Sequence, residues 1–463
     1  MANIHSFFYS SDTDKQTLHR RIIPNSTQFE QQQDRWHDLR DFLVADLNEK
    51  TGLPICTWLQ GSYKFGTQVR PKNKKEEFDI DLGIYFKWES SRDTGTYSAK
   101  ELKHLVQESL KVYASETADA TAVLEPAKER CNRISFTEGF HIDVPVYHLY
   151  EEYDLRSLTT ESGKWEDSDP KAIYLWFREN YSDDDSNQAR RLIRYMKMWS
   201  ILNLENPPSS ILLTVLVAEA YKTLSAEDVQ EDDTALFHLS KSVKARLTGT
   251  SAVSNPVDST ENLNRLSEEE YFLFLEKLDV LKNIADRALS SDSEASAASI
   301  WSEAFKHFFP APAEETAKPA ENKGLSKVLF VPQVRVIATS KTNPHHEPWI
   351  STDRIGPIPR DCSIKFKLIN FDQLPAGAHL QWIVRNEGDE AECTNDLGHP
   401  AGENTSEAVE NSAYNGSHYM DVIVTIPFQG VVGFARIPVE IKGPAIPPRN
   451  PKKPGYTKIQ RRK

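Results

Sequence analysis

Phe78-Asp79-Ile80-Asp81-Leu82-Gly83-Ile84-Tyr85-Phe86 is the stretch that decides how this sequence folds. Apolar and polar residues alternate at its start, which is typical of a β-strand with one buried face. Residues two apart on a strand point to the same side, so the carboxylates of Asp79 and Asp81 should converge. Like charges so close repel unless a cation neutralises them, and hard oxygen ligands favour Mg²⁺ or Mn²⁺. Taken alone, the pattern also suits an exposed strand face, because aspartates are usually solvated.

A second alternating segment supplies a third carboxylate. His141-Ile142-Asp143-Val144-Pro145-Val146 places His141 and Asp143 on one face of a strand. If Asp143 comes from a neighbouring strand, it completes a site for two metal ions that activate a hydroxyl and stabilise a transferred phosphoryl group. His141 is otherwise a packed or hydrogen-bonded histidine, and a zinc site built from these two residues lacks further partners.

A glycine–serine pair precedes both strands. Gln60-Gly61-Ser62-Tyr63 follows the short apolar run from Ile55 to Leu59, so the glycine stands at the end of a strand. A glycine there lets the backbone approach a phosphate, which a serine hydroxyl and free N–H groups can hold. Most such pairs are ordinary turns. The order glycine–serine, Asp-x-Asp and a third aspartate is much more specific than any of its pieces.

This order resembles the nucleotidyltransferases of DNA polymerase β type, and within them the cGAS/DncV-like nucleotidyltransferases (CD-NTases) of the DncV branch. The resemblance implies an enzyme that condenses nucleoside triphosphates, ATP and GTP above all, into a cyclic di- or trinucleotide in bacterial antiphage (CBASS) signalling. It also implies two Mg²⁺ or Mn²⁺ ions on Asp79, Asp81 and Asp143. The segments that carry it are Gln60–Tyr63, Asp79–Asp81, Phe140–Pro145, Lys164–Trp165, Ser168–Lys171, Arg194–Trp199 and Pro208–Ser210.

Further substrate contacts are implied by the same resemblance. Charged residues three apart on a helix, such as Arg194 and Lys197, are otherwise a solvated face. Phe65 is as readily a core aromatic, and Ser168-Asp169-Pro170 makes a good helix N-cap with proline at the first helical position. The implied contacts are Lys197 with Ser210 or Ser209 for the triphosphate, Gln60, Gly61 and Ser62 for the substrate, Phe65 for base stacking, and Arg133, Ser168 and Asp169 for base edges.

The pattern of helices and strands predicts an α+β protein of several domains. From about residue 169 to 310 the spacing is mainly helical, then a segment rich in Pro, Ala, Glu and Lys suits a linker. Short β-type runs follow, as in a small antiparallel sandwich. We expect a polymerase-β-like core with a mixed sheet in 1–165, including an N-terminal helix, and a helical lobe closing the active-site cleft in 166–309. A linker in 310–324, a β-sandwich in 325–446 and a basic tail in 447–463 complete the chain.

The expected sandwich resembles the adenylyl/guanylyl and SMODS C-terminal sensor domain (AGS-C). The resemblance rests on Trp382–Gly388, Tyr414–Asp421 and Val432–Arg436. It implies regulation by a small molecule or protein, with Trp382 and His418 as candidate contacts. The alternatives are a tryptophan of the sandwich core and a histidine at a strand edge.

Composition limits the partners. A net charge of −13 argues against a broad electropositive face for nucleic acid. The His and Cys spacing of the zinc thumb in animal relatives is missing, so we expect no DNA activator. Four scattered cysteines and the lack of a run of roughly 20 apolar residues favour a cytoplasmic protein without membrane contact. We expect a monomer or weak oligomer. The basic tail is either a disordered end or a contact for an acidic partner.

Two other functions stay open at this point. The chain could make linear oligonucleotides or tag RNA or protein with nucleotides, although RNA substrates favour basic surfaces. It could also be an inactive nucleotide sensor, against which the three aspartates and the Gly61-Ser62 pair argue.

Overall fold

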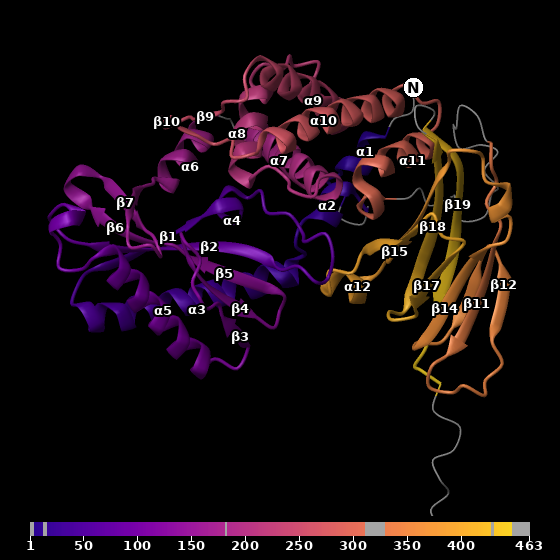
Figure 1. Ribbon diagram of the computed structural model, residues 1–463, viewed down its shortest axis with the longest axis horizontal. Helices are drawn as coiled ribbons and strands as arrows, with labels where there is room; N and C mark the ends of the chain where they lie inside the picture. The colour runs from indigo at the N-terminus through magenta and orange to yellow at the C-terminus, as the bar shows by residue number, and fades with distance from the viewer. Residues whose placement is uncertain (1–3, 13–15, 181–182, 311–328, 427–429, 447–463) are drawn as a thin grey trace, which may run out of the picture. The chain divides into compact units, whose positions relative to one another are not determined.

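The computed structural model describes residues 4–12, 16–180, 183–310, 329–426 and 430–446. The chain forms two compact units, Met1–Pro310 with Cys393–Asn395, and Ala311–Glu392 with Asp396–Lys463. Figure 1 shows their elements. Apart from Pro310, the expected linker lies outside the described residues, as does the expected basic tail.

An eight-stranded mixed sheet organises the first unit. Seven strands follow the order β3-β4-β5-β2-β6-β7-β8, and β1 pairs with β2. Strand β2 runs parallel to β5 and β6, whereas the other pairs are antiparallel. The strands are β1 (Ile55–Gln60), β2 (Phe78–Lys87), β3 (Ala120–Val123), β4 (Asn132–Phe136), β5 (Phe140–Val144), β6 (Val146–Tyr150), β7 (Leu155–Thr159) and β8 (Trp165–Asp167).

Pro145 divides the alternating segment His141–Val146, which the sequence predicts as one strand, between β5 and β6. Proline has no N–H to give to a ladder, so the strand breaks there. Its carbonyl accepts a hydrogen bond from the Ile84 N–H at 3.0 Å. As a result β2 pairs with β5 through its first half and with β6 through its second half.

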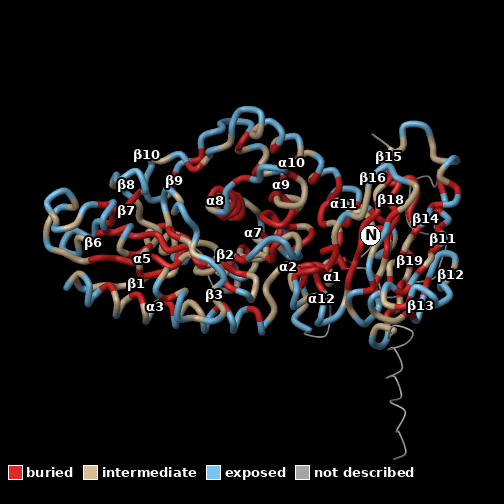
Figure 2. Tube along the Cα trace, turned by 60° about the horizontal axis from the view of Figure 1, so that its bottom comes forward, coloured by how far each residue is buried: buried red, intermediate tan, exposed pale blue. Residues whose placement is uncertain are grey.

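Two helices cover one face of this sheet, α3 (Ser26–Thr51) and α5 (Ala99–Glu116). Both begin with capping boxes, in which the N-cap side chain and the residue three positions later satisfy each other's backbone N–H. Figure 2 shows buried and exposed turns alternating along α3. Leu39 and Leu43 of α3 pack with Ile80 and Leu82 of β2 in the core. Because side chains alternate on a strand, Asp79 and Asp81 face away from the helices.

The rest of the first unit is mainly helical. The N-terminal segment is tied to it by Phe8, whose ring meets Trp301 edge-on with centroids 4.8 Å apart. Among the described residues no helix has the length and apolarity to cross a bilayer. The elements are α1 (His5–Phe8), α2 (Leu18–Ile22), α6 (Pro170–Glu179), α7 (Asp183–Asn203), α8 (Ser210–Tyr221), α9 (Asp232–Gly249), β9 (Ser254–Asn255), β10 (Asp258–Asn262), α10 (Glu268–Leu289) and α11 (Glu294–Phe305).

Two sheets around one apolar core form the second unit, in the orders β12-β11-β14-β17 and β13-β19-β18-β15-β16. Its strand pairs are antiparallel except for β13 with β19. The α+β fold with a mixed sheet, helices and a C-terminal β-sandwich is thus confirmed. The elements are β11 (Val334–Ser340), β12 (Trp349–Thr352), β13 (Ile355–Ile358), β14 (Cys362–Leu368), β15 (His379–Arg385), α12 (Asp389–Cys393), β16 (Gly398–Glu403), β17 (Glu407–Asn411), β18 (Gly416–Ile426) and β19 (Gly430–Ile441).

Candidate active site

Strand register places the expected site residues in rows across the sheet. Asp81 of β2 lies beside Asp143 of β5, and Asp143 lies beside Arg133 of β4. In the next row Asp79 pairs with His141. Neighbours across a sheet point to the same face. All three aspartates therefore face away from α3 and α5.

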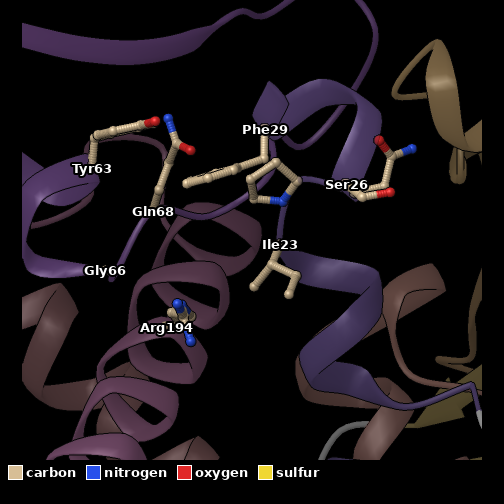
Figure 3. Close-up of a pocket in the computed structure, with 9 residues that line it drawn as sticks. Ile23, Ser26, Phe29, Tyr63, Gly66, Gln68 and Arg194 are labelled. Carbon is tan, nitrogen blue, oxygen red and sulfur yellow. The ribbon is translucent and has the colours of Figure 1, made fainter. Parts of the chain in front are cut away.

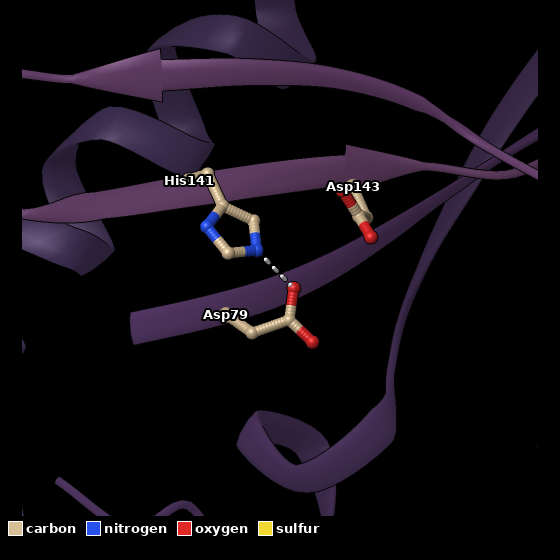
Figure 4. A group of neighbouring side chains, drawn as sticks. All are labelled: Asp79, His141 and Asp143. Atoms are coloured by element: carbon tan, nitrogen blue, oxygen red, sulfur yellow. Dashed lines mark ion pairs between the residues drawn. The ribbon is translucent and has the colours of Figure 1, made fainter. Parts of the chain in front are cut away.

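Asp79, His141 and Asp143 form a compact group of potential ligands. One ligand atom from each lies within 4.8 Å of the others (Figure 4). His141 Nε2 is 2.9 Å from Asp79 Oδ1, and Nδ1 is 2.9 Å from Glu77 Oε2. The histidine is thus both held between carboxylates and close enough to share an ion with Asp143. Glu77 was not among the expected site residues, although it stands two positions before Asp79 and so alternates in phase with Asp79 and Asp81.

Asp81 lies beside this group, against the backbone of Gly61. A Cβ built on Gly61 would come within 1.9 Å of Asp81 Oδ2. Burial raises the pKa of Asp81 well above its usual value, and the charges of Asp79 and Asp143 raise it further. Within the described residues no hydrogen bond or ion pair reaches this carboxylate.

Asp143 is neutralised by side chains from two sides. Arg133 Nε donates to Oδ1 at 2.5 Å and Nη2 donates to Oδ2 at 2.8 Å, while Lys128 Nζ donates to Oδ2 at 3.1 Å. Burial alone would raise the pKa of Asp143, but Arg133 and Lys128 bring it below its usual value. Arg133, expected at a base edge, thus lies among the acidic residues. Lys128 precedes β4, and no sequence pattern marks it.

The donor set fits a hard divalent cation. Three carboxylates and an imidazole converge on one face, and the Asp81 carboxylate lacks the countercharge that Asp143 has. Oxygen-rich sites of this kind suit Mg²⁺ or Mn²⁺. Bringing like charges together in this way is costly without a cation. Asp79, His141 and Asp143 form the group that could hold such an ion, and Asp81 lies beside them.

The glycine–serine pair opens a short helix, α4 (Gly61–Phe65), directly after β1. Gly61 has φ +58°, a left-handed conformation that glycine adopts without strain. Ser62 stands in the first turn of α4. The Gln60 side chain is engaged elsewhere, because its amide donates to Tyr85 Oη at 2.9 Å and accepts from Tyr147 Oη at 3.1 Å.

Phe65 and Asp169 have structural roles in this conformation. The Phe65 ring is 6% exposed and packs against Tyr174 and Phe177, with both centroid distances 5.6 Å. Asp169 caps α6, accepting from the N–H groups of Lys171 and Ala172. The Ser168 N–H donates to the Arg156 carbonyl at 3.4 Å. Contacts of these residues with a base stay predictions.

Lys197 reaches toward the sheet from α7. Its Nζ donates to Thr67 Oγ1 at 2.9 Å, and the residue is 3% exposed. Burial lowers the pKa of Lys197 to about 7; Arg194 lowers it too, and Asp81 opposes the shift. Ser209 caps α8 through the Leu212 N–H, and Ser210 is exposed at the first turn.

The second unit contains its own pocket of about 680 Å³. His418 lines it, although this residue is 4% exposed and its Nε2–H donates to the Tyr414 carbonyl at 2.9 Å. Trp382 is fully buried in the sandwich core, where its Nε1–H donates to the Thr405 carbonyl. The lining also includes Trp349, Arg354, Tyr419 and Glu440.

Comparisons with known proteins show which family the chain is similar to. Residues 56–147 match the model of the cyclic GMP-AMP synthase DncV-like nucleotidyltransferase domain, and residues 320–442 match the adenylyl/guanylyl and SMODS C-terminal sensor domain. A cyclic GMP-AMP synthase of Escherichia albertii is 30% identical over 447 residues, covering 95% of this chain and 96% of that relative. The chain belongs to the DncV-like nucleotidyltransferases.

Other relatives lie in the same family. A c-di-GMP synthase of Roseivirga ehrenbergii is 26% identical over 264 residues, which cover 50% of this chain and 66% of the relative. The GTP-bound structure of Vibrio cholerae DncV superposes with a TM-score of 0.57 at 21% identity, over 66% of this chain and 96% of that one. This structural likeness shows the shared fold. The expectation of a DncV-like nucleotidyltransferase with an AGS-C domain is confirmed.

Proposed function

We propose that this enzyme condenses two nucleoside triphosphates, ATP and GTP above all, into a cyclic dinucleotide with release of pyrophosphate. The observation that carries the proposal is that Asp81 faces the same side as the group containing Asp79 and Asp143, with no described side chain paired to its carboxylate beside Gly61. The printed activities of the relatives, cyclic GMP-AMP and c-di-GMP synthesis, support the class of product.

Each residue of the site has a task in this reaction. A ribose hydroxyl attacks an α-phosphorus and pyrophosphate leaves, once to join the nucleotides and once to close the ring. Bound divalent cations would acidify that hydroxyl and offset charge on the phosphoryl group. The three aspartates would hold these ions. Gly61 leaves room beside Asp81 for the approaching phosphates, and Ser62 can donate its hydroxyl to them.

Positioning falls to residues around the aspartates. We assign triphosphate contacts to Lys197, Ser209 and Ser210, and base contacts to Phe65, Arg133, Ser168 and Asp169. Lys197 must exchange its bond to Thr67 for a phosphate oxygen. Arg133 must leave Asp143 when a metal ion binds there. Ligand binding should therefore rearrange both side chains.

Product analysis tests the proposal. Full-length protein is incubated with the four labelled triphosphates and Mg²⁺ or Mn²⁺, and products are identified by mass and by resistance to phosphatase. A cyclic dinucleotide lacks terminal phosphates, so it resists. Phosphatase-sensitive products alone would point to a linear oligonucleotide synthase, and label transferred to added RNA or protein would point to a tagging enzyme.

The product would act as a second messenger in the bacterial cytoplasm, in antiphage (CBASS) signalling. Phage challenge of the native host, with wild-type protein or an Asp79→Asn, Asp81→Asn variant, checks this role. We assign regulation to the β-sandwich, whose pocket could hold a small molecule or part of a protein. The fragment 1–312 should bind triphosphates but lose that control; aggregation of the fragment would instead make the sandwich part of the catalytic fold.

A further inference from the structure

A pocket of about 290 Å³ lies in the first unit, outside the acidic group. It is formed where the segment between α2 and α3 meets the end of α4 and the middle of α7 (Figure 3). Its lining includes Asn25, Phe29, Tyr63, Gly66, Gln68 and Arg194. The aspartates of the acidic group are not among the residues that line it.

Arg194 gives this pocket an unbalanced charge. Its Nη1 donates to His19 Nε2 at 2.8 Å, and its Nε has no hydrogen-bond partner among the described residues. No described carboxylate pairs with it. Burial lowers the pKa of Arg194 to about 10, so the guanidinium is still a cation at neutral pH.

The neighbours of Arg194 do not supply a countercharge. Burial lowers the pKa of His19 to about 3, and Arg194, Arg191 and Arg20 lower it further, so the imidazole is neutral. Asp232 is engaged by Arg191, with Nε 2.7 Å from Oδ2. A partly buried charge without a countercharge is costly, because it has lost water and gained no opposite charge. An anion entering the pocket would remove this cost.

An aromatic surface stands at the other side of the pocket. Phe29 stacks on Tyr63 with centroids 5.4 Å apart and an interplanar angle of 6°. Trp36 Nε1 donates to Tyr63 Oη at 3.2 Å and fixes that ring, whereas Phe29 is 44% exposed. Figure 3 shows Phe29 and Gln68 together, across the pocket from Arg194. Gln68 Nε2 donates to the Asp79 carbonyl, which orients the amide beside the ring.

We propose that this pocket is a second ligand site for a nucleoside monophosphate-sized aromatic anion, with its phosphate on Arg194 and its base against Phe29. A volume of about 290 Å³ is at the lower end of ligand pockets, which suits one nucleotide unit and not a dinucleotide. A guanidinium pairs well with phosphate oxygens, and an exposed ring offers a stacking surface to any base. Binding here needs no divalent cation.

The experiment measures binding to full-length protein in EDTA, so that metal-dependent binding at the aspartates is silent. AMP, GMP and inorganic phosphate are titrated separately by calorimetry. Arg194→Met should weaken all three by about tenfold or more, as expected for loss of a charge-assisted contact. Phe29→Ala should weaken AMP and GMP but leave phosphate unchanged. Arg178→Met is the matched control, because it removes an exposed charge on α6 and should change nothing.

Folding and site identity have separate readouts. Without ligand, Arg194→Met should melt at or above the wild-type temperature, since it removes an unpaired charge. If that variant does not fold, the binding of AMP and GMP compared with phosphate in Phe29→Ala still tests the site. The Asp79→Asn, Asp81→Asn variant should bind AMP in EDTA as wild type does. No binding to wild-type protein, equal binding to both pocket variants, or loss of binding in the aspartate variant would overturn the second site while leaving the proposed synthase activity untouched.

Discussion

Arg133 and Asp143 face each other across β4 and β5, and the guanidinium holds both carboxylate oxygens through Nε and Nη2. This bidentate pair occupies the same oxygens that a divalent cation would need. Metal binding at Asp143 would therefore be an exchange of one positive charge for another. The affinity for metal therefore depends on the strength of the Arg133–Asp143 pair as well as on the aspartates.

Arg133→Gln should tighten Mg²⁺ binding on the order of tenfold, because a charge-assisted contact no longer competes for Asp143. The midpoint of the Mg²⁺-dependent rise in melting temperature measures it. Arg130→Gln is the control, since Arg130 pairs with Glu166 at 2.7 Å and not with the acidic group. An unchanged midpoint in Arg133→Gln would show that Arg133 does not compete with the ion. Turnover should fall if Arg133 also contacts a base.

The double substitution Asp79→Asn, Asp81→Asn should abolish product while the protein stays folded. It removes like charges that raise the pKa of Asp81 together with burial, so no new strain is introduced. Product assays and circular dichroism measure the two effects. Asp93→Asn, in an exposed turn, serves as the control. Residual synthesis by the double variant would be incompatible with the assigned metal site.

Gly61→Ala tests the close approach to Asp81. The added Cβ would fall 1.9 Å from Oδ2, so the carboxylate must move, and a displacement of this size can cost on the order of a hundredfold in turnover. Gly139→Ala is a matched control, because Gly139 also has a positive φ but its Cβ would meet nothing within 4 Å. Both variants carry backbone strain, so equal activity losses in the two would refute the steric explanation.

Lys197 predicts a pH dependence of stability. Burial lowers its pKa in the folded state to about 7, whereas an unfolded lysine titrates near ~10.4. Between pH 7 and about 10.4 the unfolded chain binds more protons than the folded chain, so the free energy of unfolding rises with pH. The contribution of the buried neutral amine to stability is therefore complete above about 10.4 and is lost as pH falls through about 7. The urea midpoint of the wild type, measured relative to that of Lys197→Met, should increase as pH rises from 7 to 10. Parallel curves would contradict the burial of this amine.

Lys197→Met should also lower kcat/KM for triphosphates by about tenfold to a hundredfold, the value of one charge-assisted contact. Steady-state rates at subsaturating triphosphate measure this, with Lys222→Met as a control on an exposed lysine. The metal dependence should not change, since Lys197 bonds to Thr67 and not to an aspartate. A wild-type rate in Lys197→Met would leave the residue without a role in substrate use.

Strand phase made the acidic group predictable, because it depends on alternation within Phe78–Phe86 and Phe140–Val144 alone. The pairing between strands decides which basic side chains contact those carboxylates. The contacts of Arg133 and Lys128 with Asp143 were therefore not predictable from the sequence. Burial of Phe65 likewise depends on α6, a separate element.

Some missed elements did carry a signal. Helix α5 was not expected, yet Leu102, Val106, Leu110 and Tyr113 recur at helical spacing and are buried. Helix α9, which lies inside the region of mainly helical spacing, has the same kind of stripe in Leu236, Leu239, Val243 and Leu247. Strands β12, β13, β16 and β17 are short, and their alternation is too brief to stand out from loops.

The hairpin of β4 and β5 has a consequence for insertions and deletions. Its loop, residues 137–139, can absorb an added residue as loops generally do. One residue added between Ile134 and Phe136 would instead shift the pairing by one, so that Arg133 would lie opposite Val144 and point into the core, with Ile134 turned to the open face. Insertions in the loop 137–139 should therefore be tolerated, whereas insertions a few positions earlier, in β4, should not be. Viable members of this lineage should then differ in loop length and never in the distance from Arg133 to the turn.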